Sequence, residues 1–300
     1  MTDALHSQSE IRRPPIPVRI AASLARAGRQ LADEPLGLSG FLILAVLCIV
    51  AIIAPALAPY DPNVQMLSDA LQPPSLAHLA GTDEFGRDIF SRLVYGTRIT
   101  IQTVLSISII VGPVGLLIGI VSGFFGGRTD AILMRATDIV LSFPSLILAL
   151  AFAAALGAGL NTAIIAISLT AWPPIARLAR AEALVVRNAD YVAAARLYGA
   201  SSLRILLLYI APMCVPSVIV RLTLNMAGII LTAASLGFLG LGAQPPAPEW
   251  GAMISSGRKF MLDYWWVAVM PGIAILLTSL AFNIAGDTLR DILDPRHARS

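Results

Sequence analysis

Few side chains in this 300-residue sequence are of the types that perform covalent chemistry, and their spacing does not support such chemistry. The histidines, His6, His78 and His297, lie in the tails and in one loop and lack metal-ligand spacing. The single lysine, Lys259, belongs to no G-x-x-x-x-G-K-[ST] sequence, so the chain has no Walker A loop to hold nucleotide phosphates. Both cysteines fall in apolar runs and are interpreted as small hydrophobic residues. The sequence thus predicts no catalytic residue, no metal site and no cofactor bound by this chain.

A binding role is indicated instead for Arg221, which lies near the middle of the apolar run 212–235. A charge at that depth is costly unless it faces protein or water. Projected at about 100° per residue, one face of the run collects Ser217, Arg221, Asn225, Gly228, Thr232 and Ser235. Candidates for lining a passage are Ser217, Arg221, Asn225 and Thr232, with the arginine attracting a carboxylate. The alternative is that this polar stripe packs against a partner helix.

The elements that hold these residues are apolar runs long enough to cross a membrane. Apolar residues make up 57% of the chain, whereas charged residues make up 13%, against about a quarter in ordinary soluble domains. The mean hydropathy is +0.78. Runs of about 20 residues, enough to span the hydrocarbon core, cover 38–58, 100–124, 131–155, 161–179, 212–235 and 265–286. The sequence therefore predicts an all-α, polytopic membrane protein with about six transmembrane helices.

Basic residues predict the orientation of these helices. With the N-terminus inside, fifteen arginines flank the cytoplasmic side and five basic residues the outer side, as the positive-inside rule expects. The same clustering favours membrane lipid over nucleic acid as a partner, despite a pI of about 9.1. We expect a multi-pass inner-membrane protein with both termini cytoplasmic. Its predicted parts are a cytoplasmic N-terminal tail (1–37), a transmembrane domain (38–286) with outer loops 59–99 and 236–264 and a cytoplasmic coupling loop 180–211, and a C-terminal tail (287–300).

The N-terminal tail is predicted to contain an amphipathic helix over residues 18–31, with apolar residues on one face and arginines on the other. A basic helix of this kind suits the cytoplasmic headgroup layer, and a solvated linker helix is the alternative. The sequence Ala56-Leu57-Ala58 resembles a signal-peptidase site. Because about 37 residues precede the apolar run, which is itself long for a signal peptide, an uncleaved first span is favoured.

The long cytoplasmic loop is predicted to contain a short helix over residues 190–198, followed by a second helix. Candidate caps are Asn188 or Asp190 at its start, Gly199 at its end, and Ser201 or Ser202 for the next helix. Pro212 is expected to bend that second helix. A short helix held between two sharp turns would be rigid enough to transmit motion from a partner to the membrane helices.

The sequence Ala194-Ala195-x3-Gly199, with Pro212 thirteen residues later, resembles the EAA loop of binding-protein-dependent ABC importer permeases. It departs from that motif at Ala193, Tyr209 and Ala211, which replace Glu, Ile and Leu. In that family the loop docks in a groove of the ATPase subunit. The resemblance implies that the residues coupling this chain to an ATPase are Asp190, Tyr191, Ala194, Ala195, Arg196, Gly199, Ala200 and Ser201.

Further stretches resemble the C-type permease of dipeptide and oligopeptide importers, namely 81–96, 142–144, 237–251 and 286–296. Related nickel and glutathione importers share much of this pattern. The resemblance covers about residues 35–297 and implies the type I fold of ABC importer permeases and half of a pathway for dipeptides or short oligopeptides. It also implies four kinds of partner: a homologous second permease subunit, two ATPase subunits that use ATP and Mg²⁺, an extracytoplasmic solute-binding protein and the peptide solute.

The two outer loops are candidates for contact with the solute-binding protein. Phe85, Ile89 and Leu93 recur every four residues, which predicts a short amphipathic helix on the outer surface. The other loop is rich in proline and contains Trp250. Docking candidates are Phe85, Arg87, Pro246 and Trp250. The alternative is that these loops close the outer mouth or fold onto their own helices.

Two other classes of function remain open but are less favoured. A secondary transporter needs coupling-ion sites at mid-membrane, and Arg221 is the one ionisable residue clearly at that depth. Asp138 and Arg135, spaced three apart, are predicted to be a local structural pair and not a proton relay. A membrane-embedded enzyme would need a nucleophile, a base or metal ligands at membrane depth, and the sequence offers none.

Overall fold

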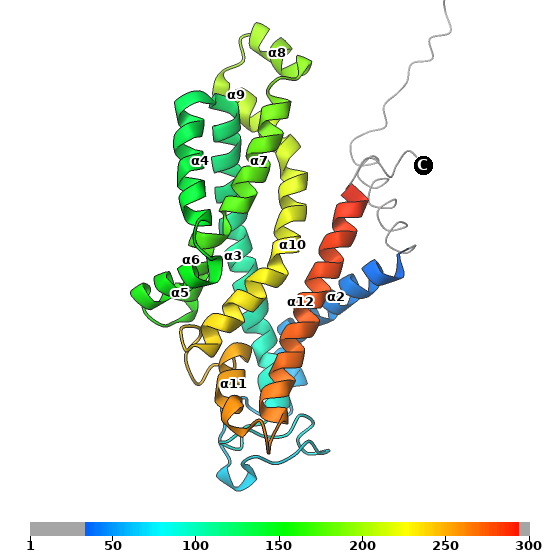
Figure 1. Cartoon of the computed structure of the whole chain (residues 1–300). Coiled ribbons are helices and arrows are strands. Elements are labelled where there is room, and N and C mark those ends of the chain that lie inside the picture. Colours follow the sequence, from blue (N-terminus) through cyan, green and yellow to red (C-terminus); the bar gives the residue numbers. More distant parts are fainter. Residues whose placement is uncertain (1–33, 294–300) are drawn as a thin grey trace, which may run out of the picture.

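The computed structural model describes residues 34–293, and within that range it contains helices and no β-strand (Figure 1). The predicted amphipathic helix over residues 18–31 lies outside the described residues, as does the end of the predicted C-terminal tail. The last helix, α12 (Trp266–Leu293), continues beyond residue 286, where the tail was predicted to begin. The all-α class is confirmed.

Long apolar helices confirm the predicted spans. Those with the length and composition to cross a membrane are α2 (Pro35–Leu57), α3 (Ile89–Phe125), α6 with α7 (Leu160–Ala171 and Pro173–Val186), the run from α9 (Ser202–Ile205) through the π-helical turn η2 (Leu206–Ile210) to α10 (Ala211–Phe238), and α12. A sixth span exists if the bent pair α4 (Gly127–Leu141) and α5 (Ser145–Leu156) is one crossing. The irregular turn η2 ends two residues before Pro212, as expected where a proline removes a backbone donor.

The third predicted span, 131–155, is not a straight helix. α4 and α5 meet at an angle of 89°. The break falls at Ser142, Phe143 and Pro144, and Pro144 occupies the N-cap position of α5. Proline disfavours helical backbone at the residue before it, so α4 ends there. Hydropathy over the window 131–155 did not reveal this bend, because it records composition and not direction, even though α4 is more polar than α5.

The second span begins earlier than predicted, at Ile89 and not at residue 100. Asp88 caps it, because its carboxylate accepts hydrogen bonds from the Ser91 backbone nitrogen and hydroxyl, both at 2.7 Å. The prediction of a separate amphipathic helix on the outer surface is therefore wrong. Its second half is the first part of α3, and its first half is an irregular segment.

Small residues allow α3 and α7 to pack with their backbones close together. A side chain at Gly115, Gly119 or Gly123 of α3 would collide with the backbone or with buried side chains of α7, such as Ile175 and Ala183. Helices in a membrane associate through such close approach. α2 packs on α12 in the same way, through Gly37 and Gly40.

The elements between the spans gather at two opposite ends (Figure 1). At one end lies α8 (Asp190–Leu197), which follows α7 and precedes α9. At the other end lie the segment 58–88, which contains η1 (Leu67–Asp69), and α11 (Trp250–Gly257) with η3 (Arg258–Phe260). The C-terminal end of α12 points toward the same side as α8. We call these regions the α8 end and the outer end below.

Candidate functional site

α8 has one buried face and one strongly exposed end. Val192 is fully buried and Ala195 nearly so, which fixes the helix against the rest of the α8 end. In contrast, Leu197 and Tyr198 are 90% and 92% exposed. Large apolar side chains this exposed outside the apolar spans are typical of a surface that meets another protein. The predicted coupling residues Asp190, Tyr191, Ala194, Arg196, Gly199 and Ser201 are exposed as well, whereas Ala200 is partly buried.

Gly199 ends α8 in the predicted way. Its φ is +78°, in the left-handed region that glycine adopts without a steric penalty. The Gly199 nitrogen donates to the Arg196 carbonyl at 2.9 Å, and the Ala200 nitrogen donates to the Ala195 carbonyl at 3.0 Å. These two bonds define a Schellman motif, which sets the direction in which the chain leaves the helix.

The caps of α8 and α9 were predicted only in part. Ser201 is the N-cap of α9, and its hydroxyl accepts a hydrogen bond from the Arg204 nitrogen at 3.3 Å. The N-cap of α8 is Ala189, which makes no side-chain bond. Asn188 bonds back to the Leu184 carbonyl at 3.0 Å instead, and Asp190 is the first helical residue. The prediction that Asn188 or Asp190 caps α8 is therefore wrong, although Asp190 still favours the positive end of the helix dipole.

Side chains attach α8 to the neighbouring spans. Arg187, just before α8, donates through Nη1 to the Gly123 carbonyl of α3 at 2.8 Å. The Arg196 guanidinium lies over the Phe124 ring at 5.6 Å. Tyr191 stacks on Tyr209 of η2 with ring centroids 6.5 Å apart. Displacement of α8 would therefore reach α3 and α10 through these contacts.

The predicted polar stripe on α10 is present on a single face. Arg221 is exposed and forms no ion pair with any residue between 34 and 293, while Ser217, Asn225 and Thr232 are partly buried. The Thr232 hydroxyl donates to the Gly228 carbonyl at 2.8 Å, which satisfies it within its own helix. An exposed arginine at membrane depth requires water, solute or another chain beside it.

The carboxylates of α4 form ion pairs with arginines of another helix, and not with arginines of α4 itself. Asp138 accepts a hydrogen bond from Arg177 of α7 at 2.6 Å, so the predicted local pair with Arg135 is wrong. Asp130 of α4 pairs with Arg180 of α7. This second pair was not predicted, because charged residues beside an apolar run were interpreted only as indicators of membrane topology. The signal available was an aspartate four residues after Gly126, together with the basic residues between positions 177 and 187.

The outer end is interlocked by buried polar groups. Arg87 donates through Nε to Asp83 at 2.6 Å, and Arg92 donates through Nη1 to the Pro62 carbonyl at 2.7 Å. The Trp250 indole nitrogen donates to the Leu93 carbonyl at 3.2 Å. Arg87 is only 8% exposed and Trp250 only 2%.

Burial divides the four predicted docking residues. Arg87 and Trp250 are buried and hold the outer end together in this structure, so neither offers more than a small surface to a partner. Phe85 and Pro246 are exposed and stay candidates. A cleft of about 200 Å³ at this end is lined by Phe85, Arg87, Pro245, Ala247 and Ser256 among others, and Pro246 lies between two of these residues in the chain. This cleft lies on the outer face and not along the α10 stripe.

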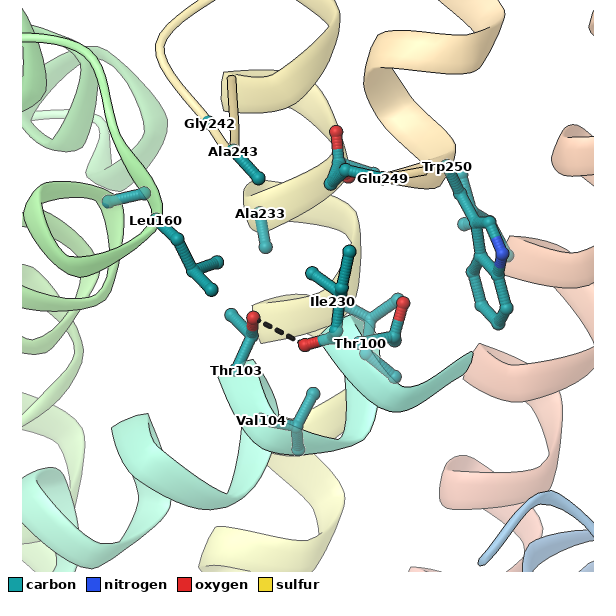
Figure 2. Close-up of a pocket in the computed structure, with 14 residues that line it drawn as sticks. Thr100, Thr103, Val104, Leu160, Ile230, Ala233, Gly242, Ala243, Glu249 and Trp250 are labelled. Carbon is teal, nitrogen blue, oxygen red and sulfur yellow. Dashed lines mark hydrogen bonds between the residues drawn. The ribbon is translucent and has the colours of Figure 1, made fainter. Parts of the chain in front are cut away.

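A second cavity lies between α3, α6 and α10, beneath Glu249 and Trp250 (Figure 2). It measures about 20 Å³ and is lined mainly by apolar side chains such as Val104, Leu160 and Ile230. That volume holds about one water molecule. The Thr103 hydroxyl is already bonded to the Ile99 carbonyl at 2.7 Å. This cavity is too small to hold the predicted peptide solute.

Within residues 34–293, no group of three or more potential metal ligands comes together. The described part of the chain thus has the exposed helix α8 at one end, a polar face on α10, and an outer end held together by buried polar groups.

Comparison with protein families gives two matches. Residues 115–299 match the family described as "Binding-protein-dependent transport system inner membrane component". Residues 23–74 match the "N-terminal TM domain of oligopeptide transport permease C".

Similar proteins have names that agree with these families. The "Probable D,D-dipeptide transport system permease protein" of Escherichia coli K12 is 47% identical over 266 residues, 89% of each chain. The "Di/tripeptide transport system permease protein" of Pseudomonas aeruginosa is 46% identical and covers 85% of this chain and 86% of its own. A chain of the MetNI methionine ABC transporter in an inward-facing conformation superposes with a TM-score of 0.54. It is 20% identical and covers 68% of this chain and 97% of its own length, which shows a shared fold.

Proposed function

Because the chain belongs to the family of binding-protein-dependent transport system inner membrane components, we propose that it forms half of the pathway by which an ABC importer takes up dipeptides or short oligopeptides. Relatives named as dipeptide and di/tripeptide permeases support the solute class. The observation that carries the proposal is α8, a short helix with an exposed tip that projects from the spans at one end.

The peptide is proposed to pass along the polar face of α10. Arg221 lies exposed at membrane depth without an ionic partner among residues 34–293, so it can attract the carboxylate of a peptide. A second permease subunit would supply the opposite wall. Such an arrangement explains why an arginine is tolerated on an outward face of a single chain.

The energy is proposed to come from partner ATPase subunits that bind ATP and Mg²⁺, since this sequence contains no Walker A loop. Leu197, Tyr198 and the exposed coupling residues would form the contact with one ATPase subunit. Closure of the ATPase pair would displace α8, and the spans attached to it would follow.

The α8 end is proposed to be cytoplasmic, with both termini on that side. The excess of arginine beside this end supports the assignment. Reporters fused after residues 30, 127, 190 and 298 should read as cytoplasmic, and those at 75 and 248 as external. An external signal at 190 would contradict the contact between α8 and a cytoplasmic ATPase.

The direct test of function is uptake by the reconstituted importer. The chain, its partner permease and the ATPase subunits are placed in proteoliposomes with the solute-binding protein and a labelled dipeptide. We expect uptake only when ATP and the loaded binding protein are both present, with competition by other short peptides. Uptake without ATP would favour a secondary transporter, and competition only by glutathione or a nickel chelate would move the solute to another class.

A further inference from the structure

Three helices at the α8 end meet at one carboxylate, that of Asp130 in α4. Arg180 of α7 donates through Nε to Asp130 Oδ1 at 2.5 Å and through Nη2 to Oδ2 at 2.6 Å. The Ser122 hydroxyl of α3 donates to Oδ1 at 2.5 Å. We call these three residues the Asp130 clasp. A bidentate guanidinium–carboxylate pair is geometrically specific, so it resists sliding of one helix past the other.

The same two helices carry a second ion pair that serves as an internal comparison. Arg177 of α7 donates to Asp138 of α4 through Nη2 alone, at 2.6 Å. Its side chains are 54% and 53% exposed, against 32% and 21% for Arg180 and Asp130. An exposed pair with a single hydrogen bond contributes little to the packing of two helices.

Few other side chains of α4 are buried against α7. Thr137 is the one buried residue of α4. α3 and α7, in contrast, interlock over several turns through glycine and alanine. Apolar packing therefore makes α3 and α7 one unit. α4 is joined to that unit by the chain turn at Gly126, and beyond this turn the described side-chain contacts between α4 and α7 are polar.

The chain beyond α7 joins this unit directly to α8. Arg187 bonds to the Gly123 carbonyl, and Arg196 lies over Phe124, so α8 is attached to the end of α3. At its other end, α4 leads into α5 through the 89° bend. A displacement of α8 thus reaches α3 through Arg187 and Arg196. It reaches α4 and α5 through the chain turn at Gly126 and, beyond that turn, through the Asp130 clasp. Figure 1 shows the order of these helices.

We propose that Asp130, held by Arg180 and Ser122, is the positioning residue that makes α4 and α5 move together with α7 and α8 during transport. The proposal rests on the proposed function of α8 as the contact with the ATPase. Asp130 itself does not touch that partner in this account. Loss of the Asp130 carboxylate should leave α8 intact, but a displacement of α8 should then no longer move α4 and α5.

The test is the number of peptides imported per ATP hydrolysed by the complete importer in proteoliposomes. For Asp130→Asn, which keeps the shape and removes the charge, we expect normal assembly and continued hydrolysis, with the ratio falling about fivefold or more. Asp138→Asn is the matched control, because it breaks the exposed pair between the same helices. It should leave the ratio within about twofold of wild type.

Two further variants distinguish coupling from general damage. Ser122→Ala keeps the ion pair and removes one hydrogen bond, so its ratio should fall by about twofold. The charge-reversed pair Asp130→Arg with Arg180→Asp should recover most of the ratio that Asp130→Asn loses. The proposal is overturned if Asp130→Asn has a normal ratio, if Asp138→Asn lowers the ratio equally, or if Asp130→Asn and Ser122→Ala both fail to assemble.

Failure of this proposal and failure of the proposed function give different results. If α8 does not contact an ATPase, Gly199→Val will bind the ATPase and transport normally. If only the clasp is wrong, Gly199→Val will be defective and Asp130→Asn will be normal.

Discussion

Two helices end in the same motif at opposite ends of the molecule. α8 ends at Gly199 and α10 ends at Gly240, both with φ of +78°. In each, the next residue donates to a carbonyl five positions back, from Ala200 to Ala195 and from Leu241 to Leu236. A Cβ at either glycine would meet no other atom within 4 Å. The local geometry is therefore equal, but the surroundings differ.

Around Gly240 the chain is interlocked. Glu249 caps α11 through the Gly251 and Ala252 nitrogens, and the indoles of Trp250 and Trp266 bond to backbone carbonyls of distant segments. Before Gly199 lies only the short helix α8, attached by side chains such as Arg187, Val192 and Arg196. Elements that move or bind partners are drawn from regions of low local stability. The difference indicates an outer end that keeps its shape and an α8 end that can be displaced.

The largest effect should come from breaking the outer end at Gly86. This glycine has φ of +70°, and a Cβ would collide with the Met66 carbonyl. Gly86→Val should lower the free energy of unfolding by about 3 kcal/mol or more, because strain and collision act together. Thermal unfolding in detergent measures this. Gly272→Ala is the control, since its Cβ meets no atom within 4 Å and its helical backbone suits alanine. Equal Tm values for both variants would show that the outer end is not rigid.

Arg221 lies between the α8 end and the outer end, and its substitution should alter the structure of neither end. Arg221→Ala is expected to lower peptide uptake about tenfold, the loss of one desolvated charge contact with the solute. Assembly and ATP hydrolysis should stay near wild type, because the side chain forms no ion pair within residues 34–293. Failure of this variant to assemble would instead show that Arg221 packs against a partner helix.

An insertion of a few residues after Pro246 tests whether the outer end receives the binding protein. The loop is exposed there and borders the cleft of about 200 Å³. We expect stimulation of ATP hydrolysis by the loaded binding protein to fall several-fold. Basal hydrolysis should be retained, since the α8 end is unchanged. Normal stimulation in a normally assembled complex would remove this loop from the docking surface.

The smallest effect concerns Glu249, whose pKa is raised above its usual 4.5 mainly by burial, although two backbone N–H groups oppose the shift. A carboxyl that binds its proton more tightly in the folded state favours folding at low pH. Stability of the outer end should therefore be highest below pH 4.5 and should fall as pH rises through the raised pKa. Glu249→Gln should flatten this dependence of Tm on pH. If Glu249→Gln leaves the slope of Tm against pH unchanged, the pKa of Glu249 is the same in the folded and unfolded chain.

Apolar run length and turn chemistry made much of the fold predictable. Spans such as α10 and α12 follow from runs of apolar residues, and the end of α8 follows from a glycine where positive φ is required. The bend between α4 and α5 was missed because hydropathy is insensitive to direction, although Pro144 marked the place.

Side-chain partners across helices could not be predicted. Asp138 pairs with Arg177, 39 positions away, and not with the nearer Arg135. The exposure of Trp250 was also misjudged, because an aromatic residue in a proline-rich loop is equally compatible with docking and with burial. These properties depend on which helices meet, and one sequence does not contain that information. Contact of α8 with an ATPase and passage along α10 stay predictions.

The most direct test of the account is whether the ATPase subunit copurifies with the Gly199→Val variant. A β-branched side chain disfavours the left-handed conformation, so α8 should unwind or leave at a different angle. We predict that Gly199→Val inserts into the membrane at normal levels but loses the ATPase on purification, and that Gly199→Ala does so partially. Gly240→Val introduces the same strain at the outer end and should keep the ATPase bound. Retention of the ATPase by both valine variants, or equal loss from both, would contradict the claim that α8 is the contact.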